Sequence, residues 1–151
     1  METIVTKTMT AIMSSYGILE INYLNDVSIE VVEMLENIEA INKLCNNSPF
    51  KMLVVLNEFT FTSIDAKIIL IEYTRKINHL LIAEAIVVRS LQARFLENYY
   101  SLQNKDFYLI RIFNDRNKAK KWLTEIENKN KWRNRSLNSD SLIVAEITKN
   151  I

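Results

Sequence analysis

Apolar and polar residues alternate partially along two short segments near the start of the chain, Met9–Met13 and Ile18–Leu24. Between them lies a polar loop, Ser14–Gly17, which ends on the single glycine of the sequence. Two partly alternating runs joined by a short loop that contains glycine are typical of a β-hairpin. The pattern therefore predicts a pair of antiparallel strands in this region.

Beyond the hairpin, the apolar positions change to a spacing that is typical of a helix. Asp26 and Ser28 are candidate N-caps, and a helix would end at Asn46–Pro49. Between these limits, six apolar residues recur at every third position, namely Ile29, Val32, Leu35, Ile38, Ile41 and Leu44. We expect these side chains to form the buried face of one helix, with Cys45 beside them as a small core residue.

The following part of the chain alternates between predicted strands and helices. Strands are predicted at Met52–Leu56, Ala83–Val88 and Phe107–Phe113, and the first of these is continuously apolar, as in strands with both faces buried in a parallel sheet. Helices are predicted from Thr62 to Ile77, at Leu91–Leu102, and from Asn114 or Asp115 onward. The last helix should turn four side chains inward, those of Ala119, Trp122, Leu123 and Ile126.

This order of elements predicts an α/β fold with a single-layer mixed sheet. The sheet should be mostly parallel, with an N-terminal antiparallel hairpin, and should be flanked by about four helices. A chain of 151 residues, 48% of them hydrophobic, is the right size for one compact domain, which we place at residues 1–128. Residues 129–151 form a polar C-terminal extension, in which Leu142–Thr148 is a candidate short strand.

The composition excludes several classes of protein. With one glycine the chain cannot form a Walker loop or a dinucleotide-binding turn, and with one histidine and one cysteine a zinc site would need carboxylates for its other ligands. We therefore expect no catalytic residue, no cofactor and no metal site, in a protein that is not an enzyme. The longest apolar runs are too short to span a membrane, and no secretory signal is visible, so a cytoplasmic protein is expected.

Two residues with titratable side chains have competing interpretations. His79 follows a predicted helix, where an imidazole can bond the last carbonyl groups, and we prefer this interpretation to a catalytic one. Glu84 interrupts an apolar strand. We expect it at a strand end that faces solvent, and the alternative is a buried acid with a raised pKa.

Three segments together resemble the bacterial STAS-like domains, the group that contains the sporulation anti-anti-sigma factor. They are YGILEINYL at Tyr16–Leu24, VVLNEFTFTSIDAK at Val54–Lys67, and FNDRNKAKKWL at Phe113–Leu123. The resemblance covers roughly Met9 to Lys129 and suggests an uncharacterised branch of the group. It implies the same α/β fold, a bacterial origin, and a function in binding other proteins.

The resemblance also points to the start of the helix after Thr62. In partner-switching members of the group, Asp-Ser-Ser-Gly opens this helix and its first serine is phosphorylated; the aligned residues here are Ser63, Ile64, Asp65 and Ala66, so the motif is not intact. A shift of one residue would place Ser63 at the phosphorylated position. We expect Thr62 to act as an N-cap in a capping box with Asp65. Phosphorylation and anion binding at Thr62 and Ser63 remain alternatives.

Basic residues gather near the end of the chain. Eight basic and two acidic residues lie between positions 116 and 135, whereas the remaining sequence holds eleven basic and sixteen acidic residues. The part of this segment that includes a tryptophan has the composition of a nucleic-acid contact. Its residues are Lys129, Lys131, Trp132, Arg133 and Arg135. A solvated helix end with a polar tail has the same composition, and we prefer that interpretation.

The leading functional hypothesis is a non-catalytic STAS-like domain that docks a protein partner or a second copy of itself, through the helix that begins at Thr62. The alternative is a carrier of small apolar ligands or lipids, similar to CRAL-TRIO domains, with Ile68, Leu70 and Ile71 as a pocket wall. A weaker alternative is nucleic-acid binding by the basic C-terminal end. The resemblance supports the first of these, and the scarcity of catalytic residue types supports it further.

Overall fold

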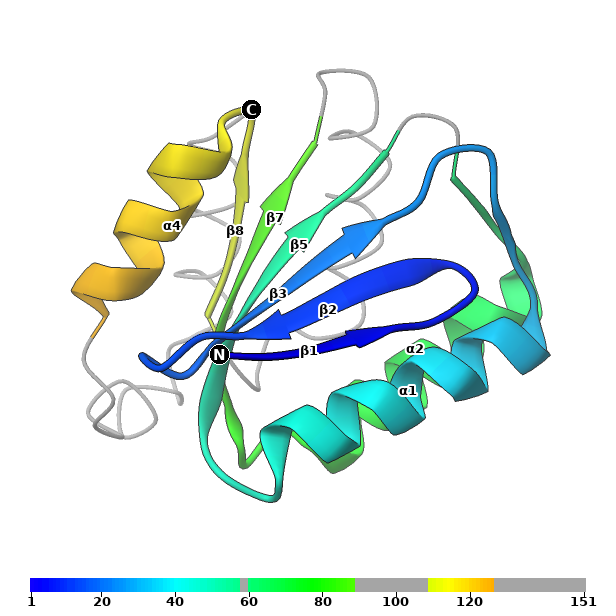
Figure 1. The fold of residues 1–151 in the computed structure, drawn as a ribbon, viewed down its shortest axis with the longest axis horizontal. Coiled ribbons are helices and arrows are strands. Elements are labelled where there is room, and N and C mark those ends of the chain that lie inside the picture. Colours follow the sequence, from blue (N-terminus) through cyan, green and yellow to red (C-terminus); the bar gives the residue numbers. More distant parts are fainter. Residues whose placement is uncertain (58–59, 89–108, 127–151) are drawn as a thin grey trace.

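A six-stranded sheet runs through the middle of the protein, with helices on both of its faces (Figure 1). The computed structural model describes residues 1–57, 60–88 and 109–126. The strands of the sheet lie side by side in the order in which they occur in the sequence: β1 (Glu2–Val5), β2 (Met9–Met13), β3 (Ile18–Tyr23), β5 (Phe50–Val55), β7 (Leu81–Val87) and β8 (Leu109–Phe113). The expected α/β fold with a mixed sheet is confirmed.

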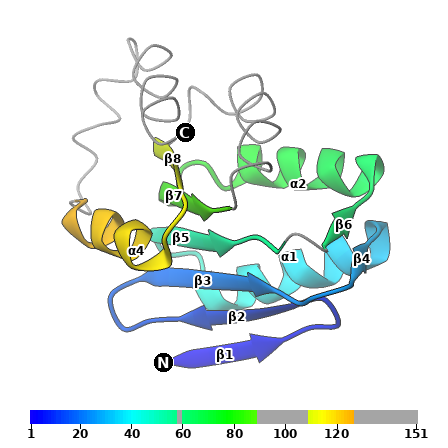
Figure 2. The same cartoon turned by 90° about the horizontal axis from the view of Figure 1, so that it is seen from above.

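Helices α1 (Val31–Cys45) and α2 (Ile64–Lys76) pack on one face of the sheet, and α4 (Arg116–Glu125) packs on the other (Figure 2). The fourth expected helix, Leu91–Leu102, lies outside the described residues, as does the extension 129–151 with its basic residues. The domain boundary at residue 128 therefore stays a prediction. Of the helices in the described ranges, none combines the length and apolar content that a membrane crossing requires.

The N-terminal hairpin is confirmed, and it is part of a larger antiparallel unit. β2 and β3 pair antiparallel as predicted, and β1, which was not predicted, adds a third antiparallel strand at the sheet edge. Gly17 in the β2–β3 loop has a φ of 74°, a left-handed conformation that glycine adopts without steric cost. The β1–β2 turn is attached to α1, because Thr6 donates a hydrogen bond to the Asn37 amide oxygen (2.6 Å) and the Asn37 amide group donates to Thr8 (2.9 Å).

The central strands are parallel, as the apolar run at Met52 predicted. β5 lies between β3 and β7 and is parallel to both, and β7 is parallel to β8. Met52 and Leu53 point to opposite faces of β5, and both are buried. The apolar residues Met52, Leu53 and Val54 of β5 therefore lie where neither face of the strand meets water.

A second, two-stranded sheet was not predicted. β4 (Ser28–Ile29) and β6 (Phe61–Thr62) pair parallel directly before α1 and α2, respectively. The pairing is extended by hydrogen bonds from the Phe61 N–H to the Val27 carbonyl and from the Ser63 N–H to the Ile29 carbonyl, both 3.0 Å. The two helices therefore begin side by side.

The expected face of α1 was right for Ile41 and Leu44 and wrong for Val32 and Leu35. Met34, Ala40, Ile41, Leu44 and Cys45 are buried, whereas Val32 and Leu35 are exposed. A spacing of three falls short of the 3.6-residue helical turn, so residues repeated at every third position rotate steadily around the helix axis.

The expected N-caps of α1 were also wrong. Asp26 has a left-handed backbone, with a φ of 56°, and Ser28 belongs to β4. The helix is capped at Glu30, whose N–H donates to the Glu33 carboxylate (3.1 Å). The helix therefore begins later than the cap residues indicated, because the two residues of β4 come between them and its first turn.

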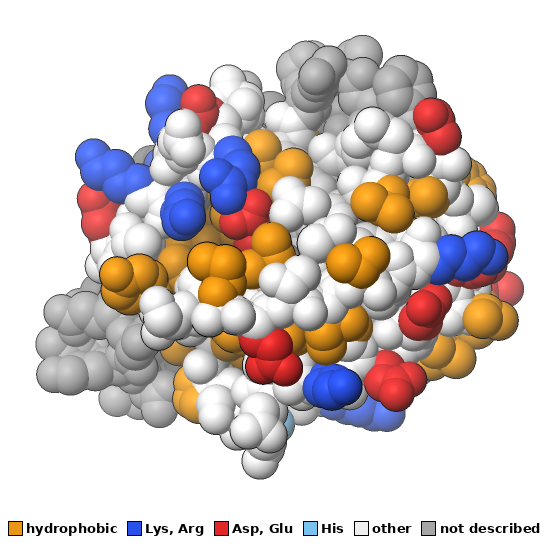
Figure 3. Space-filling model, viewed as in Figure 1, with side chains coloured by type: hydrophobic (Ala, Val, Ile, Leu, Met, Phe, Trp, Pro, Cys, Tyr) orange, Lys and Arg blue, Asp and Glu red, His pale blue; other side chains and the backbone are white. Residues whose placement is uncertain are grey.

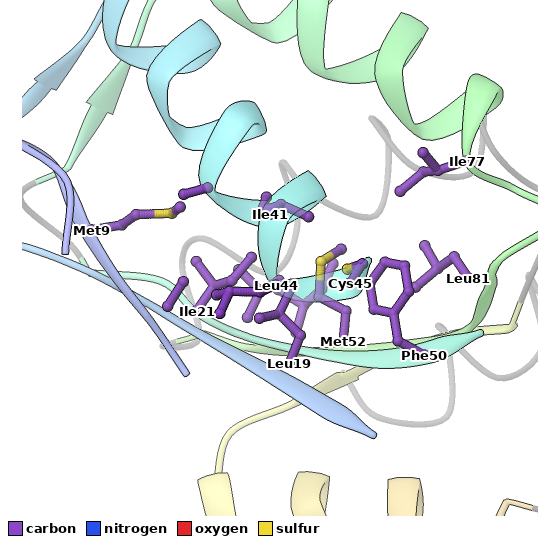
Figure 4. Close-up of a cluster of buried hydrophobic side chains, with 14 of the residues drawn as sticks. Met9, Leu19, Ile21, Ile41, Leu44, Cys45, Phe50, Met52, Ile77 and Leu81 are labelled. Atoms are coloured by element: carbon purple, nitrogen blue, oxygen red, sulfur yellow. The ribbon is translucent and has the colours of Figure 1, made fainter. Parts of the chain in front are cut away.

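The core on the α1 side of the sheet is formed by side chains from the strands and from α1, together with residues after α2 (Figure 4). The residues labelled there are Met9, Leu19, Ile21, Ile41, Leu44, Cys45, Phe50, Met52, Ile77 and Leu81. Burial raises the pKa of the Cys45 thiol to about 12, which confirms Cys45 as a core residue that is not ionised at neutral pH.

The other face of the sheet is covered by α4, as its apolar positions predicted. The Asp115 carboxylate caps the helix by accepting a hydrogen bond from the Lys118 N–H (2.9 Å). Ala119 and Leu123 are fully buried, and Trp122 lies against the Phe113 ring with a centroid separation of 5.7 Å. The packing leaves the basic side chains of this helix on the outside.

Candidate functional site

The hydroxyl groups that the sequence analysis singled out lie directly before the first turn of α2. Ser63 is the N-cap, and its hydroxyl oxygen accepts a hydrogen bond from the Ala66 N–H (3.2 Å). The expected capping box of Thr62 and Asp65 was wrong by one residue, because Thr62 belongs to β6 and Asp65 lies exposed in the first turn of the helix. The capping interpretation itself is confirmed for Ser63.

Large apolar side chains are exposed around the paired starts of α1 and α2. Their exposed fractions lie between 47% and 76%, and we call the group the apolar face: Val32, Leu35, Phe61, Ile64 and Ile68. Val32 and Leu35 occupy the first turns of α1, and Ile64 and Ile68 occupy the first turns of α2. Because β4 and β6 hold these helix ends together, the side chains of the apolar face come from neighbouring parts of the surface.

A cavity of about 490 Å³ lies between the sheet and the two helices, next to the β4–β6 pair. Its lining is mainly apolar and comes from β3, β5 and β7 on one side and from α1 and α2 on the other. The lining residues are Ile21, Tyr23, Ile29, Met34, Ile41, Met52, Val54, Leu56, Asn57, Thr60, Phe61, Thr62, Lys67, Leu70, Tyr73, Thr74, Glu84 and Ile86. Its volume is in the range of roughly 300–1,000 Å³ that is typical of small-molecule sites.

Glu84 lies in the wall of this cavity, and the expectation that it faces solvent was wrong. Only 2% of its surface is exposed. It occupies the middle of β7, opposite Met52 of β5 and Ile110 of β8. Burial, and then the negative charge of Glu84, raises the pKa of Tyr23 to about 12, so the Tyr23 phenol stays protonated at neutral pH.

Among the described residues, His79 does not join this site. His79 is exposed in the turn after α2, and within the described ranges its imidazole makes no hydrogen bond to the last carbonyls of the helix; the Tyr73 carbonyl accepts instead from the Ile77 N–H (3.1 Å). The described residues contain no group of three or more His, Cys, Asp or Glu side chains that could hold a metal ion.

The basic side chains of α4 gather at the upper left of the space-filling view (Figure 3). One of them, Arg116, forms two hydrogen bonds to the Glu20 carboxylate at 2.8 and 2.6 Å. The other candidates for a nucleic-acid contact, Lys129 to Arg135, lie outside the described residues.

Comparison with protein families gives a match over most of the chain. A family model described as a domain of unknown function, DUF7793, matches residues 12–127. The chain belongs to the DUF7793 family. No curated protein matches this DUF7793 chain.

The fold of this DUF7793 protein also occurs in a solved structure. That structure is of an uncharacterized protein from the DUF3478 family, with a SpoIIAA-like fold, from Shewanella loihica PV-4. The two chains are 14% identical and superpose with a TM-score of 0.60, over 76% of this chain and 91% of the other. The STAS-like fold that the sequence suggested is confirmed by this likeness.

The sequence offered a pocket only as an alternative, with Ile68, Leu70 and Ile71 as its wall, and of these three residues only Leu70 lines the cavity. It also placed Glu84 incorrectly. The strand begins at Leu81, two residues before the predicted start, and this shift moves Glu84 from a strand end to the middle of β7. The one available signal was the apolar sequence on both sides of Glu84, which suits a buried position as well as a terminal one.

Proposed function

We propose that the protein is a non-catalytic docking domain that binds another protein through the apolar face. The observation that carries this proposal is the exposure of five large apolar side chains at the paired starts of α1 and α2. Large apolar side chains that are exposed in the same region of a protein are a feature of interaction sites. The resemblance to STAS-like domains supports the same surface, since in that group the interaction site lies at the corresponding helix, which begins near Thr62 here.

The charged residues around the apolar face indicate which side chains a protein partner would present. On a helix, residues four positions apart are neighbours, so Glu36 lies next to Val32, Glu39 next to Leu35, and Glu72 next to Ile68. All three glutamates are exposed. Lys67, three positions after Ile64, is also exposed, so the rim is mainly but not wholly acidic. The partner would therefore present apolar anchors flanked mainly by lysine or arginine side chains.

A bacterial, cytoplasmic setting belongs to the same proposal. The non-catalytic part is supported by the sequence, which offers one histidine and one cysteine as candidates for general acid–base or nucleophilic chemistry. His79 is exposed and Cys45 is buried.

The test is affinity capture from the native host with three forms of the tagged full chain. The first is the wild type and the second carries Ile64→Ser and Ile68→Ser, which remove two apolar anchors without adding charge. The third is the control Tyr16→Ser, since Tyr16 is similarly exposed, at 80%, but lies in the β2–β3 loop, at the opposite end of β2 from the turn that contacts α1. Captured proteins are identified by mass spectrometry and tested individually for binding.

We expect a partner that binds the wild type and the control equally and the double variant roughly tenfold or more weakly, because buried apolar anchors dominate interface energies. Sedimentation velocity on the purified chain tests whether the partner is a second copy. Equal capture of the same proteins by all three forms would overturn the proposal.

A further inference from the structure

The cavity between the sheet and the two helices is much larger than the voids of an ordinary protein core. Protein interiors are close-packed, and few of their voids exceed the size of one water molecule. A volume of about 490 Å³ has room for roughly sixteen water molecules at ~30 Å³ each. The walls include Met52, Leu70 and Ile86, whose side chains offer water no hydrogen bond. An apolar occupant would therefore be favoured over water in this space.

One polar group of the cavity wall lacks a hydrogen bond within the part of the chain that the structure describes. Tyr23, at the end of β3, lines the cavity and packs against the core, and among those residues its hydroxyl group has no hydrogen-bond partner. A tyrosine hydroxyl that is removed from water normally finds one. The Tyr73 phenol, in the same wall, donates to the Asn42 amide oxygen (2.9 Å). The Tyr23 hydroxyl is therefore a polar group that a ligand can engage.

The Tyr23 hydroxyl is a hydrogen-bond donor under physiological conditions. Its pKa of about 12, raised first by burial, keeps the phenol protonated at neutral pH. A phenol donates one hydrogen bond through its O–H group. The matching group on a ligand is an acceptor, such as a carbonyl or ester oxygen.

The charged residues of the cavity lining do not favour an ionic ligand. Glu84 and Lys67 both line the cavity and carry opposite charges, so together they give it no net preference for either sign. Each of them also has a further interaction within the protein. An ionised ligand would lose its hydration on entering an apolar space, which costs free energy unless the charge is paired there. A neutral ligand avoids this cost.

We propose that the cavity binds a small neutral molecule with an apolar body and one hydrogen-bond-accepting oxygen, such as a medium-chain ketone or ester, and that this oxygen accepts from the Tyr23 hydroxyl. The inference does not rest on the docking proposal, because Tyr23, Met52 and Leu70 are not part of the apolar face. It is also narrower than the apolar carrier that the sequence left as an alternative, since it names the hydrogen-bonding residue and requires a neutral ligand.

Titration calorimetry with three probes of equal chain length tests the inference on the purified full chain. The probes are 2-decanone, n-decylamine and decanoate, each used below its solubility limit and its micelle concentration. We expect 2-decanone to bind at one site per chain, about tenfold or more tightly than either charged probe, because it gives up no charge hydration when it enters the cavity.

Four variants locate the binding site. Tyr23→Phe removes the hydroxyl group and keeps the ring, so the affinity for 2-decanone should fall about threefold to tenfold, as for the loss of one hydrogen bond. Tyr16→Phe is the matched control, because Tyr16 is 80% exposed in the β2–β3 loop, and it should leave the affinity unchanged. Leu70→Trp fills part of the cavity and should weaken binding tenfold or more. Ile64→Ser alters the apolar face but not the cavity lining, and should bind as the wild type does.

Four results would overturn the inference. They are no saturable binding of 2-decanone to the wild type, tighter binding of a charged probe than of 2-decanone, equal effects of Tyr23→Phe and Tyr16→Phe, and binding that Ile64→Ser weakens while Leu70→Trp does not. The last result would place the probe on the apolar face. If Tyr23→Phe fails to fold, Leu70→Trp still decides whether the probe enters the cavity, and the three probes still decide whether the ligand is neutral.

Discussion

Replacing Ser63 with alanine should destabilise the protein by about 1–2 kcal/mol. The hydroxyl oxygen of Ser63 accepts the hydrogen bond of the Ala66 N–H at 3.2 Å, and Ala66 has no exposed surface. Water therefore cannot take the place of the missing oxygen, which puts the cost in the upper part of the usual range for an N-cap. Ser63→Asp should retain most of the stability, because a carboxylate caps the same N–H and opposes the positive end of the helix dipole.

Urea unfolding followed by circular dichroism measures the effect. With a slope of roughly 2 kcal/mol per molar urea, the expected loss lowers the midpoint of Ser63→Ala by about 0.5–1 M. Thr62→Ala is the matched control, because within the described ranges the Thr62 hydroxyl makes no hydrogen bond, and its midpoint should move by less than half as much.

A larger effect of Thr62→Ala than of Ser63→Ala would refute the assignment of the cap. A second result would refute the interpretation that the Ser63 hydroxyl serves only to cap α2. If Ser63→Asp unfolds at the wild-type midpoint but loses a partner that the wild type binds, Ser63 acts as a signalling group, and its alignment with the phosphorylated serine of STAS-like domains is the correct one.

Three further predictions concern other parts of the fold. Gly17→Ala should cost about 1 kcal/mol in urea unfolding, from the left-handed backbone alone, since no atom lies within 4 Å of the added carbon; Gly17→Asn should cost less. Cys45 should resist iodoacetamide in the native protein at pH 8 and react fully in urea, and rapid native labelling would contradict its burial. Burial opposes the ionisation of Glu20, but hydrogen bonds from Arg116 and Asn22 outweigh it and lower the pKa of Glu20 below 4.5. The stability that this pair contributes is thus present above pH 4.5 and lost as the pH falls below it, and Arg116→Ala should remove this pH dependence at a cost below about 1 kcal/mol.

The sequence predicted an element correctly where the position of that element follows from its own residues. The apolar run at Met52–Leu56 can avoid water only inside a sheet, and β5 lies there. Asp115 was one of two candidate caps, and it caps α4 through a short side-chain contact that depends on nearby residues alone. The helix around Trp122 was likewise oriented correctly by its own apolar positions.

The sequence did not predict features that depend on contacts between residues far apart in the chain. β4 and β6 have two residues each, too few to show a period, and they exist because each supplies the other's partner. The exposure of Val32 and Leu35 follows from the helix period together with the position of the sheet. The cavity is bounded by elements that are far apart in the sequence, so no local pattern could reveal that Glu84 borders an open space.

The spatial order of the six strands, which equals their order in the sequence, has a consequence for folding during synthesis. β1, β2 and β3 pair through contacts within the first 23 residues, so they close short loops at a low entropic cost. β5 can pair only after α1 has been made, and β7 only after α2. Each new strand then meets the open edge left by the strand before it. The sheet therefore grows from one edge to the other in the direction in which the ribosome releases the chain.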